Sequence, residues 1–237
     1  IELISDILFN SKIRQSDVNK EKQVVISELY QNLDSPMLSV IKCINSCFEG
    51  HPLQHDIIGT EQHVLNFDSK TILKYYKKFY VPSNMVLSIT GHFPKNIKQL
   101  IKKYFQTKGK KGTQFFNPIP KQFLTKQTEP KIVVMNRARK QPSLTVGFAI
   151  DSNLYDDKMD IMLQLFCIIF GNNPNSRLYY EIREKATIAY SMDCNYLLFQ
   201  DVGFFYIHLS FDKHSLFRNK LLDTKKGVLY LIIEEIK

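Results

Sequence analysis

In the first half of the chain the apolar residues return every three or four positions, a spacing typical of amphipathic helices. The segments that follow this pattern are residues 1–10, 16–34, 36–48, 69–80 and 94–105. Between the last two of them, the short apolar run 85–89 predicts a buried strand. Residues 50–60 contain two glycines and a proline, so they predict a loop.

Strand patterns and helix patterns alternate in the second half. The expected strands are 131–135, 143–149, 188–197 and 202–211, and the expected helices are 156–170, 176–185 and 227–236. Only a short break separates the last two strands, so they should pair as antiparallel neighbours. This mixture favours an α+β fold in which helices cover one face of a mainly antiparallel sheet.

Residues 108–130 interrupt both patterns with glycines, prolines and lysines, and they predict an interdomain connection. Phe115, Phe116 and Phe123 argue against a free linker, because so much apolar surface prefers to pack. The expected division is 1–107 for part of a first domain and 131–237 for a second domain. Both outer ends lie inside apolar helix patterns, so we expect a fragment whose second domain is truncated.

Composition narrows the class of protein. With 44% hydrophobic and 12% aromatic residues the chain can build a packed core. Its 32 basic and 23 acidic residues give a net charge of +9, but the excess is spread along the chain, which is typical of a solvated surface and not of a nucleic-acid partner. No apolar run approaches the roughly 18 residues of a membrane span, and no signal peptide is recognisable. The four cysteines form no C-x-x-C pair, which indicates a reducing, intracellular compartment, either the cytoplasm or an organelle such as the mitochondrion.

Two glutamates of the helix 16–34 are the first candidates for chemistry. Ser16 or Asp17 can cap this helix, and Glu21 and Glu28 lie seven residues apart on it, which is about 10.5 Å along one face. A carboxylate beside apolar neighbours is costly to bury unless it is paired or binds a cation. Taken on spacing alone, two solvated glutamates remain the simpler interpretation.

His51 and His55 have the i, i+4 spacing of a helical metal site. Gly50 and Pro52 argue against a helix there, so we expect a loop with structural polar contacts instead.

Four segments, in this order, resemble the insulinase/pitrilysin family of zinc metallopeptidases, which includes the mitochondrial processing peptidases. They are EKQVVISELYQNLDSP (21–36), GHPLQHDIIGT (50–60), YVPSNMVLSITGHF (80–93) and NSRLYYEIREKATIAYS (175–191). The resemblance implies two similar domains, each with a mainly antiparallel sheet and helices on one face. It also implies a zinc-dependent endopeptidase that cleaves peptides or presequences with a metal-activated water.

The same resemblance assigns roles to four residues. Glu28 corresponds to the third zinc ligand, and Glu21 to an acid that supports the site by accepting hydrogen bonds. Arg183 and Tyr190 correspond to residues of the second domain that hold the substrate backbone, and the tyrosine hydroxyl can also donate to the oxyanion. Both residues also have a purely structural interpretation. Arg183 could form an i, i+4 charge pair, and Tyr190 could occupy an ordinary strand position. One departure from the family lies between them: Thr187 stands where many relatives have a flexible Gly.

The other two ligands of the family's single zinc ion are histidines of an H-x-x-E-H motif. None of the six histidines forms that motif, and in the family it lies upstream of the Glu28 helix. The two histidine ligands are therefore expected outside this chain, and the fragment alone should bind zinc weakly and be inactive. The alternative is a non-catalytic interaction subunit of the same fold, like the partner subunit of a processing peptidase. Expected partners are a peptide or unfolded protein substrate and, in a homodimer or heterodimer, a second half of the same fold.

Overall fold

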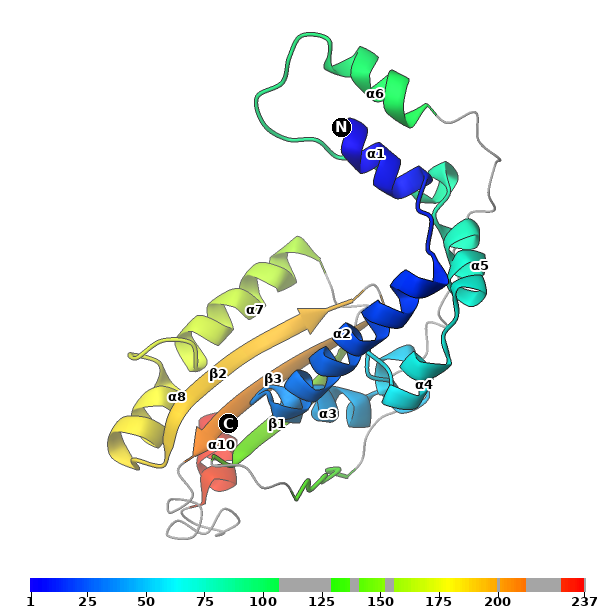
Figure 1. Cartoon of the computed structure of the whole chain (residues 1–237). Coiled ribbons are helices and arrows are strands. Elements are labelled where there is room, and N and C mark those ends of the chain that lie inside the picture. Colours follow the sequence, from blue (N-terminus) through cyan, green and yellow to red (C-terminus); the bar gives the residue numbers. More distant parts are fainter. Residues whose placement is uncertain (107–128, 137–140, 152–155, 200, 212–226, 237) are drawn as a thin grey trace. The chain divides into compact units, whose positions relative to one another are not determined.

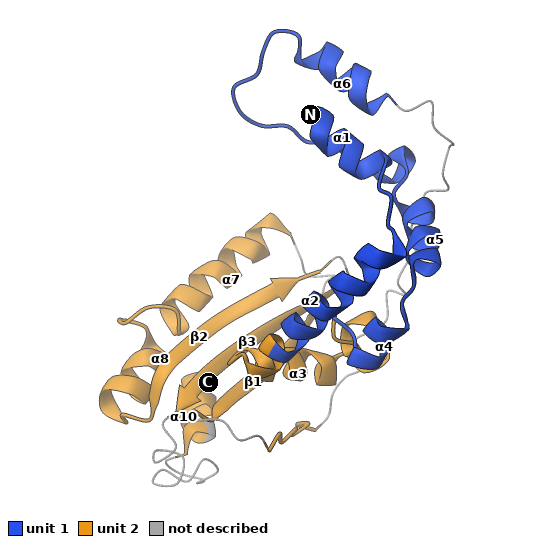
Figure 2. Ribbon diagram, viewed as in Figure 1, with its two compact units in different colours: residues 1–30, 58–118 blue, residues 31–57, 119–237 orange. Residues whose placement is uncertain are grey.

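The structure is a computed structural model that describes residues 1–106, 129–136, 141–151, 156–199, 201–211 and 227–236 (Figure 1). The chain divides into two compact units, and each is made of two segments. Unit 1 is Ile1–Tyr30 with Ile58–Pro118, and unit 2 is Gln31–Ile57 with Ile119–Lys237 (Figure 2). Residues 31–57 therefore pack with the carboxy-terminal half of the chain, while the domain boundaries expected from the sequence stay a prediction.

The described part of unit 1 is helical. Its helices are α1 Glu2–Phe9, most of α2 Gln15–Asp34, α4 Glu61–Asn66, α5 Ser69–Phe79 and α6 Ile97–Phe105, with a 3-10 turn η2 Pro82–Asn84. The rings of Phe9 and Phe105 meet edge to face at 6.0 Å and hold α1 against α6. Asp68 caps α5 by accepting a 2.7 Å hydrogen bond from the Thr71 amide. These elements confirm the helices expected from the apolar spacing, and α4 is an addition to them.

Two predicted strands are wrong. Residues 85–89 and 131–135 are apolar, but the structure describes neither segment as strand. An isolated strand cannot satisfy its backbone groups, and the described part of the chain offers these segments no neighbouring strand. Most of their side chains are exposed, with Val86 96% and Ile132 77% exposed. Apolar composition alone therefore did not make them part of a sheet.

Unit 2 contains the sheet. Its strands are β1 Ser143–Asp151, β2 Ala189–Leu198 and β3 Val202–Phe211, in the order β1-β3-β2, with β3 in the middle (Figure 1). Both neighbours run antiparallel to β3, so Ile207 faces Val146 on one side and Cys194 on the other. Every residue of β3 is buried. The predicted antiparallel pairing and the α+β class are confirmed.

Helices of the carboxy-terminal half cover one face of this sheet. They are α7 Asp157–Phe170, α8 Arg177–Tyr179, the π-helical turn η4 Tyr180–Lys185 and α10 Val228–Ile236. The core on this side joins β3 residues such as Ile207 and Leu209 to Leu178, Ile182 and Ile232, and none of the five has exposed surface. Burying each such side chain contributes roughly 1.5–3 kcal/mol, so this face holds the second half together.

The other face of the sheet is covered by α3 Leu38–Cys47. Alternate β3 residues, Val202, Phe204 and Tyr206, pack there against Val40 and Phe48. The prediction had placed helices on one face only, and α3 adds a helix to the second. Its sequence shows the apolar stripe but not the surface that the stripe covers.

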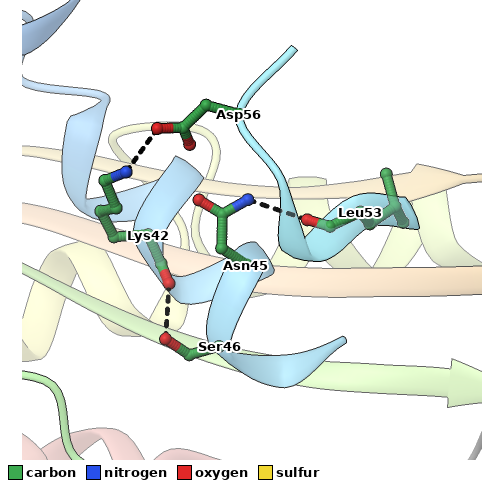
Figure 3. A network of polar contacts seen from close by, with 5 residues as sticks. All are labelled: Lys42, Asn45, Ser46, Leu53 and Asp56. Atoms are coloured by element: carbon green, nitrogen blue, oxygen red, sulfur yellow. Dashed lines mark hydrogen bonds and ion pairs between the residues drawn. The ribbon is translucent and has the colours of Figure 1, made fainter. Parts of the chain in front are cut away.

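Polar contacts fix the segment that follows α3, which includes the 3-10 turn η1 Pro52–Gln54 (Figure 3). Asn45 donates a 2.8 Å hydrogen bond to the Leu53 carbonyl, and Lys42 forms a 2.5 Å ion pair with Asp56. The ion pair is partly solvated and is worth at most about 1 kcal/mol. The Asn45 hydrogen bond is also only partly buried, so the two contacts together hold this segment on the helix.

We expect Gly147→Ala to loosen α3 from β1. An added Cβ would lie 2.4 Å from Phe204 Cζ and 2.6 Å from Cys43 Sγ, closer than such atoms pack. Overpacking of this kind typically destabilises by about 2 kcal/mol. A urea titration followed by circular dichroism should show a lower midpoint. The substitution Phe204→Leu removes the ring atom nearest to the new methyl group, so it should harm the Gly147→Ala protein less than the wild type. Equal harm in both would show that the contact at Gly147 is not tight.

Among the helices that the structure describes, none combines the length and the apolar composition that crossing a bilayer requires.

Candidate functional site

The structure brings Arg183 and Tyr190 together. The Arg183 guanidinium carbon lies 5.5 Å from the centre of the Tyr190 ring and 4.9 Å from that of Tyr179. Its Nη1 also donates a hydrogen bond to the Tyr179 hydroxyl. At these distances the planar cation is attracted to the faces of both rings. A cation and two phenols therefore form one cluster, which we call the Arg183 cluster.

Local geometry explains how Arg183 reaches this position. Tyr179 and Arg183 are four residues apart in the continuous helix made by α8 and η4, so they share a face. Ile182, adjacent to Arg183, is fully buried and anchors the turn in the core. The turn ends with an i+5 bond from the Ala186 amide to the Glu181 carbonyl. Such π-helical turns are rare and frequently lie at functional sites.

The purely structural interpretation of Arg183 is an i, i+4 charge pair within the segment EIREK. The structure assigns that pair to other residues: Lys185 Nζ lies 2.9 Å from Glu181 Oε2. Glu181 raises the pKa of this lysine, which is exposed. Arg183 contacts aromatic rings instead, so its charge is not neutralised by that carboxylate.

Tyr190 sits at an irregularity of β2. Ala189 pairs with Phe211 and Ser191 with Ser210, so the register shifts and Tyr190 is the extra residue of a β-bulge. Bulges redirect a side chain, and Tyr190 is 73% exposed although it belongs to a strand. The interpretation of Tyr190 as an ordinary strand residue therefore does not describe this position well.

The turn between Arg183 and Tyr190 is strained. Thr187 has a φ of 52°, in the left-handed region that a β-branched residue rarely adopts. Gly, which the family resemblance leads us to expect at this position, adopts the conformation freely.

We expect Thr187→Gly to stabilise the protein. A left-handed conformation costs an L-residue roughly 1–2 kcal/mol, and the entropy of Gly in the unfolded chain offsets part of the gain, so about 0.5–1 kcal/mol should remain. The thermal unfolding midpoint should rise. Thr187→Ala is the matched control, because it removes the side chain but still requires a positive φ. A similar rise with Ala would mean that the Thr side chain, and not the backbone, is the source of strain.

Glu21 and Glu28 both lie on α2, and both are exposed. Val18 and Leu29 form the buried stripe of this helix, and the two glutamates are displaced from Val18 by roughly 60–80° around the axis. They share one side of the helix next to its buried stripe, as expected. Both belong to unit 1, whereas Arg183 and Tyr190 belong to unit 2.

The residues that the structure describes do not fit a zinc ion by themselves. No group of three or more His, Cys, Asp or Glu side chains among them could hold a metal. A catalytic zinc needs three protein ligands. Glu28 alone offers a single carboxylate, which is fewer ligands than a catalytic zinc requires.

His51 and His55 make separate structural contacts, as the loop interpretation predicts. His51 is buried at the start of η1, where its Nε2 lies 2.8 Å from Asp201 Oδ2 and its Nδ1 accepts from the Leu53 amide. His55 Nε2 lies 3.2 Å from the side-chain amide of Gln54. Neither contact resembles metal ligation.

A buried polar cluster between α3 and the sheet was not expected from the sequence. Two hydroxyls approach His208 Nδ1, that of Ser39 at 3.2 Å and that of Thr145 at 3.1 Å. Burial lowers the pKa of His208, so the neutral ring is favoured, while Asp193 acts in the opposite direction. The Asp193 carboxylate accepts from the Tyr206 hydroxyl at 3.1 Å. In a hydrolytic triad one nitrogen of the histidine faces the nucleophile and the other faces the acid. Here two hydroxyls contact the same nitrogen. We therefore interpret the cluster as a structural contact between α3 and the sheet.

The chain is similar to known proteins in sequence and in fold. The family described as the peptidase M16 inactive domain matches residues 66–237. An uncharacterized zinc protease of Rickettsia bellii is 30% identical over 99% of this chain and 56% of its own length. Cytochrome b-c1 complex subunit 1 of Caenorhabditis elegans, a mitochondrial protein, is 24% identical over 100% of this chain and 50% of its own.

A solved structure shows the same fold. The peptidase M16 inactive domain of Pseudomonas fluorescens superimposes with a TM-score of 0.77 at 18% identity, over 99% of this chain and 54% of that one. The chain thus spans about half the length of the relatives it matches. Because the family match covers most of the sequence, the chain belongs to the peptidase M16 family.

Proposed function

We propose that this chain is part of a zinc-dependent metalloendopeptidase of the insulinase/pitrilysin type, which cleaves peptides or presequences. The observation that carries the proposal is the exposed Tyr190, which a β-bulge turns out of the strand toward the Arg183 guanidinium. The name of the Rickettsia bellii relative, a zinc protease, supports it. Zinc in such an enzyme polarises the scissile carbonyl and activates water.

In this proposal Arg183 binds the substrate backbone. A guanidinium offers five N–H donors in a rigid fork, which suits the carbonyl oxygens of an extended peptide. The Tyr190 hydroxyl donates a hydrogen bond to the oxygen that becomes negative in the transition state.

The two glutamates have different parts. Glu28 supplies a carboxylate ligand to zinc, together with two histidines from residues outside this sequence. Glu21 accepts hydrogen bonds that orient the ligands. The division into a zinc-site domain within 1–107 and a substrate-contacting domain within 131–237 belongs to the same proposal, as does pairing with a second half of the same fold.

The test uses the full-length protein. Purified protein should contain one zinc per active site and should cleave an unfolded protein such as reduced casein and internally quenched peptides. A chelator should stop cleavage, and added zinc should restore it. Metal-free protein that cleaves as fast, or zinc-loaded protein that cleaves nothing, would contradict the proposal.

A second candidate is a non-catalytic subunit of the same fold. The match to cytochrome b-c1 complex subunit 1 favours it, because that name describes a component of an assembly. In that case the coding sequence upstream of Ile1 would lack an H-x-x-E-H motif, and the protein would purify in a larger complex without zinc. An in-frame motif would favour the peptidase.

A further inference from the structure

We propose that Tyr179 is a positioning residue, which holds the Arg183 guanidinium in the orientation that binds the substrate backbone. The inference rests on the proposed function and adds a residue that acts through Arg183. It starts from two contacts that Tyr179 makes with one cation: its hydroxyl accepts from Nη1, and its ring face lies 4.9 Å from Cζ.

The two contacts restrict different motions of the side chain. Contact with the ring faces of Tyr179 and Tyr190 limits where the plane of the guanidinium can lie. The hydrogen bond to the Tyr179 hydroxyl limits rotation of the fork within that plane. An arginine has many rotamers, so fixing it before the substrate arrives lowers the entropy lost on binding.

The donors of Arg183 also match this role. Of its five N–H groups, the hydrogen bond to Tyr179 uses one. No carboxylate pairs with Arg183 in the part of the chain that the structure describes, since the neighbouring Glu181 pairs with Lys185. The remaining edge of the fork is therefore suited to one or two carbonyl oxygens of an extended peptide.

The neighbouring residue provides a matched control. Tyr180 follows Tyr179 directly, belongs to the same helical segment and is 59% exposed. Tyr180 lies three residues before Arg183, but the hydrogen bond and the ring contacts of the Arg183 side chain are made with Tyr179 and Tyr190. Tyr180→Phe removes one hydroxyl oxygen, as Tyr179→Phe does, but it leaves the contacts within the Arg183 cluster in place.

The experiment compares Tyr179→Phe and Tyr180→Phe in the zinc-loaded full-length protein, each alone and combined with Arg183→Ala. Tyr179→Phe keeps the ring and removes the acceptor, so KM should rise about 3- to 10-fold while kcat changes less than about 2-fold. Tyr180→Phe should leave both constants within about 2-fold of the wild type. In the Arg183→Ala background, Tyr179→Phe should have no further effect, because it acts through the arginine.

Several outcomes would overturn the inference. An equal rise in KM with and without Arg183 would show that Tyr179 acts on the substrate or on the fold directly. An equal effect of Tyr180→Phe would show a general response of the helix, and a wild-type KM in Tyr179→Phe would show that the hydrogen bond has no role.

A second readout separates this inference from the proposed function. If the full-length protein cleaves nothing, the peptidase proposal fails, and the same variants are compared by fluorescence anisotropy with a labelled unfolded peptide and metal-free protein. A 3- to 10-fold weaker Kd for Tyr179→Phe that disappears in the Arg183→Ala background supports the positioning role without catalysis. Unchanged affinity, or no binding by the wild type, overturns it.

Discussion

Replacing Glu28 by glutamine in the full-length protein should abolish stoichiometric zinc and, with it, peptide cleavage. A neutral amide is a poor ligand for Zn²⁺, and a catalytic site that loses one of three protein ligands loses most of its affinity. Because Glu28 is exposed on α2, the substitution should leave the fold and its thermal midpoint nearly unchanged. The measurement is zinc per protein chain after dialysis, by mass spectrometry of the metal.

Two other acids of α2 make this result specific. Asp17→Asn removes an exposed carboxylate from the first turn of the same helix and should keep full zinc occupancy. Glu21→Gln should weaken zinc binding by about 10- to 100-fold, the usual effect of losing a group that orients metal ligands. If Glu28→Gln retained one tight zinc, Glu28 would be a solvated helix residue and the metal site would lie elsewhere.

Helices could be predicted well because their signals are local. The spacing of apolar residues and the capping side chains both lie within one segment, as for Asp156, whose side chain accepts from the Met159 amide at 2.7 Å at the start of α7. The same kind of signal at α4 was overlooked: Thr60 caps it by accepting from the His63 amide. A short helix without a long apolar stripe is found more easily by its cap.

Strands were less predictable because a strand depends on its partners. Residues 85–89 and 131–135 have the apolar character of β1, but in the described part of the chain they pair with nothing. Strand β3 was identified correctly, yet its complete burial follows from two neighbouring strands and from helices on both faces. Gly147 gives a similar case. Glycine is unfavourable in the interior of a strand, so the sequence alone suggests that it weakens β1. The structure shows that Cys43 of α3 and Phe204 of β3 lie too close for a larger residue at this position.

The candidate site was predictable to the extent that it resembles the family. The resemblance identified Arg183 and Tyr190, and the structure brings these two side chains together. It did not indicate the β-bulge that exposes Tyr190, since a bulge is defined by the register with β3. Tyr179 could have been found from its i, i+4 spacing to Arg183, a pattern that the sequence already contains.

Tyr190→Phe in the zinc-loaded, full-length protein should lower kcat about 100-fold, because losing one oxyanion donor removes on the order of 3 kcal/mol of transition-state stabilisation. Zinc content and thermal midpoint should stay at wild-type values, since the Tyr190 side chain is mostly exposed and the ring is retained. Arg183→Ala should instead act mainly on KM, because it removes contacts made before and during reaction alike. The measurement is kcat and KM on a quenched peptide, with zinc content determined on the same samples.

A second tyrosine of β2 shows what a structural role would look like. The Tyr196 hydroxyl donates a 2.6 Å hydrogen bond to Asp160 of α7. Tyr196→Phe should therefore reduce the free energy of unfolding by roughly 1 kcal/mol and lower the thermal midpoint. It should leave kcat per folded molecule unchanged. Tyr190→Phe should give the opposite pattern, with lost turnover and intact stability. If Tyr190→Phe kept full activity, or lost it only in proportion to unfolded protein, its hydroxyl would have no part in the reaction. The exposed bulge would then have to be explained by the packing of β2 alone.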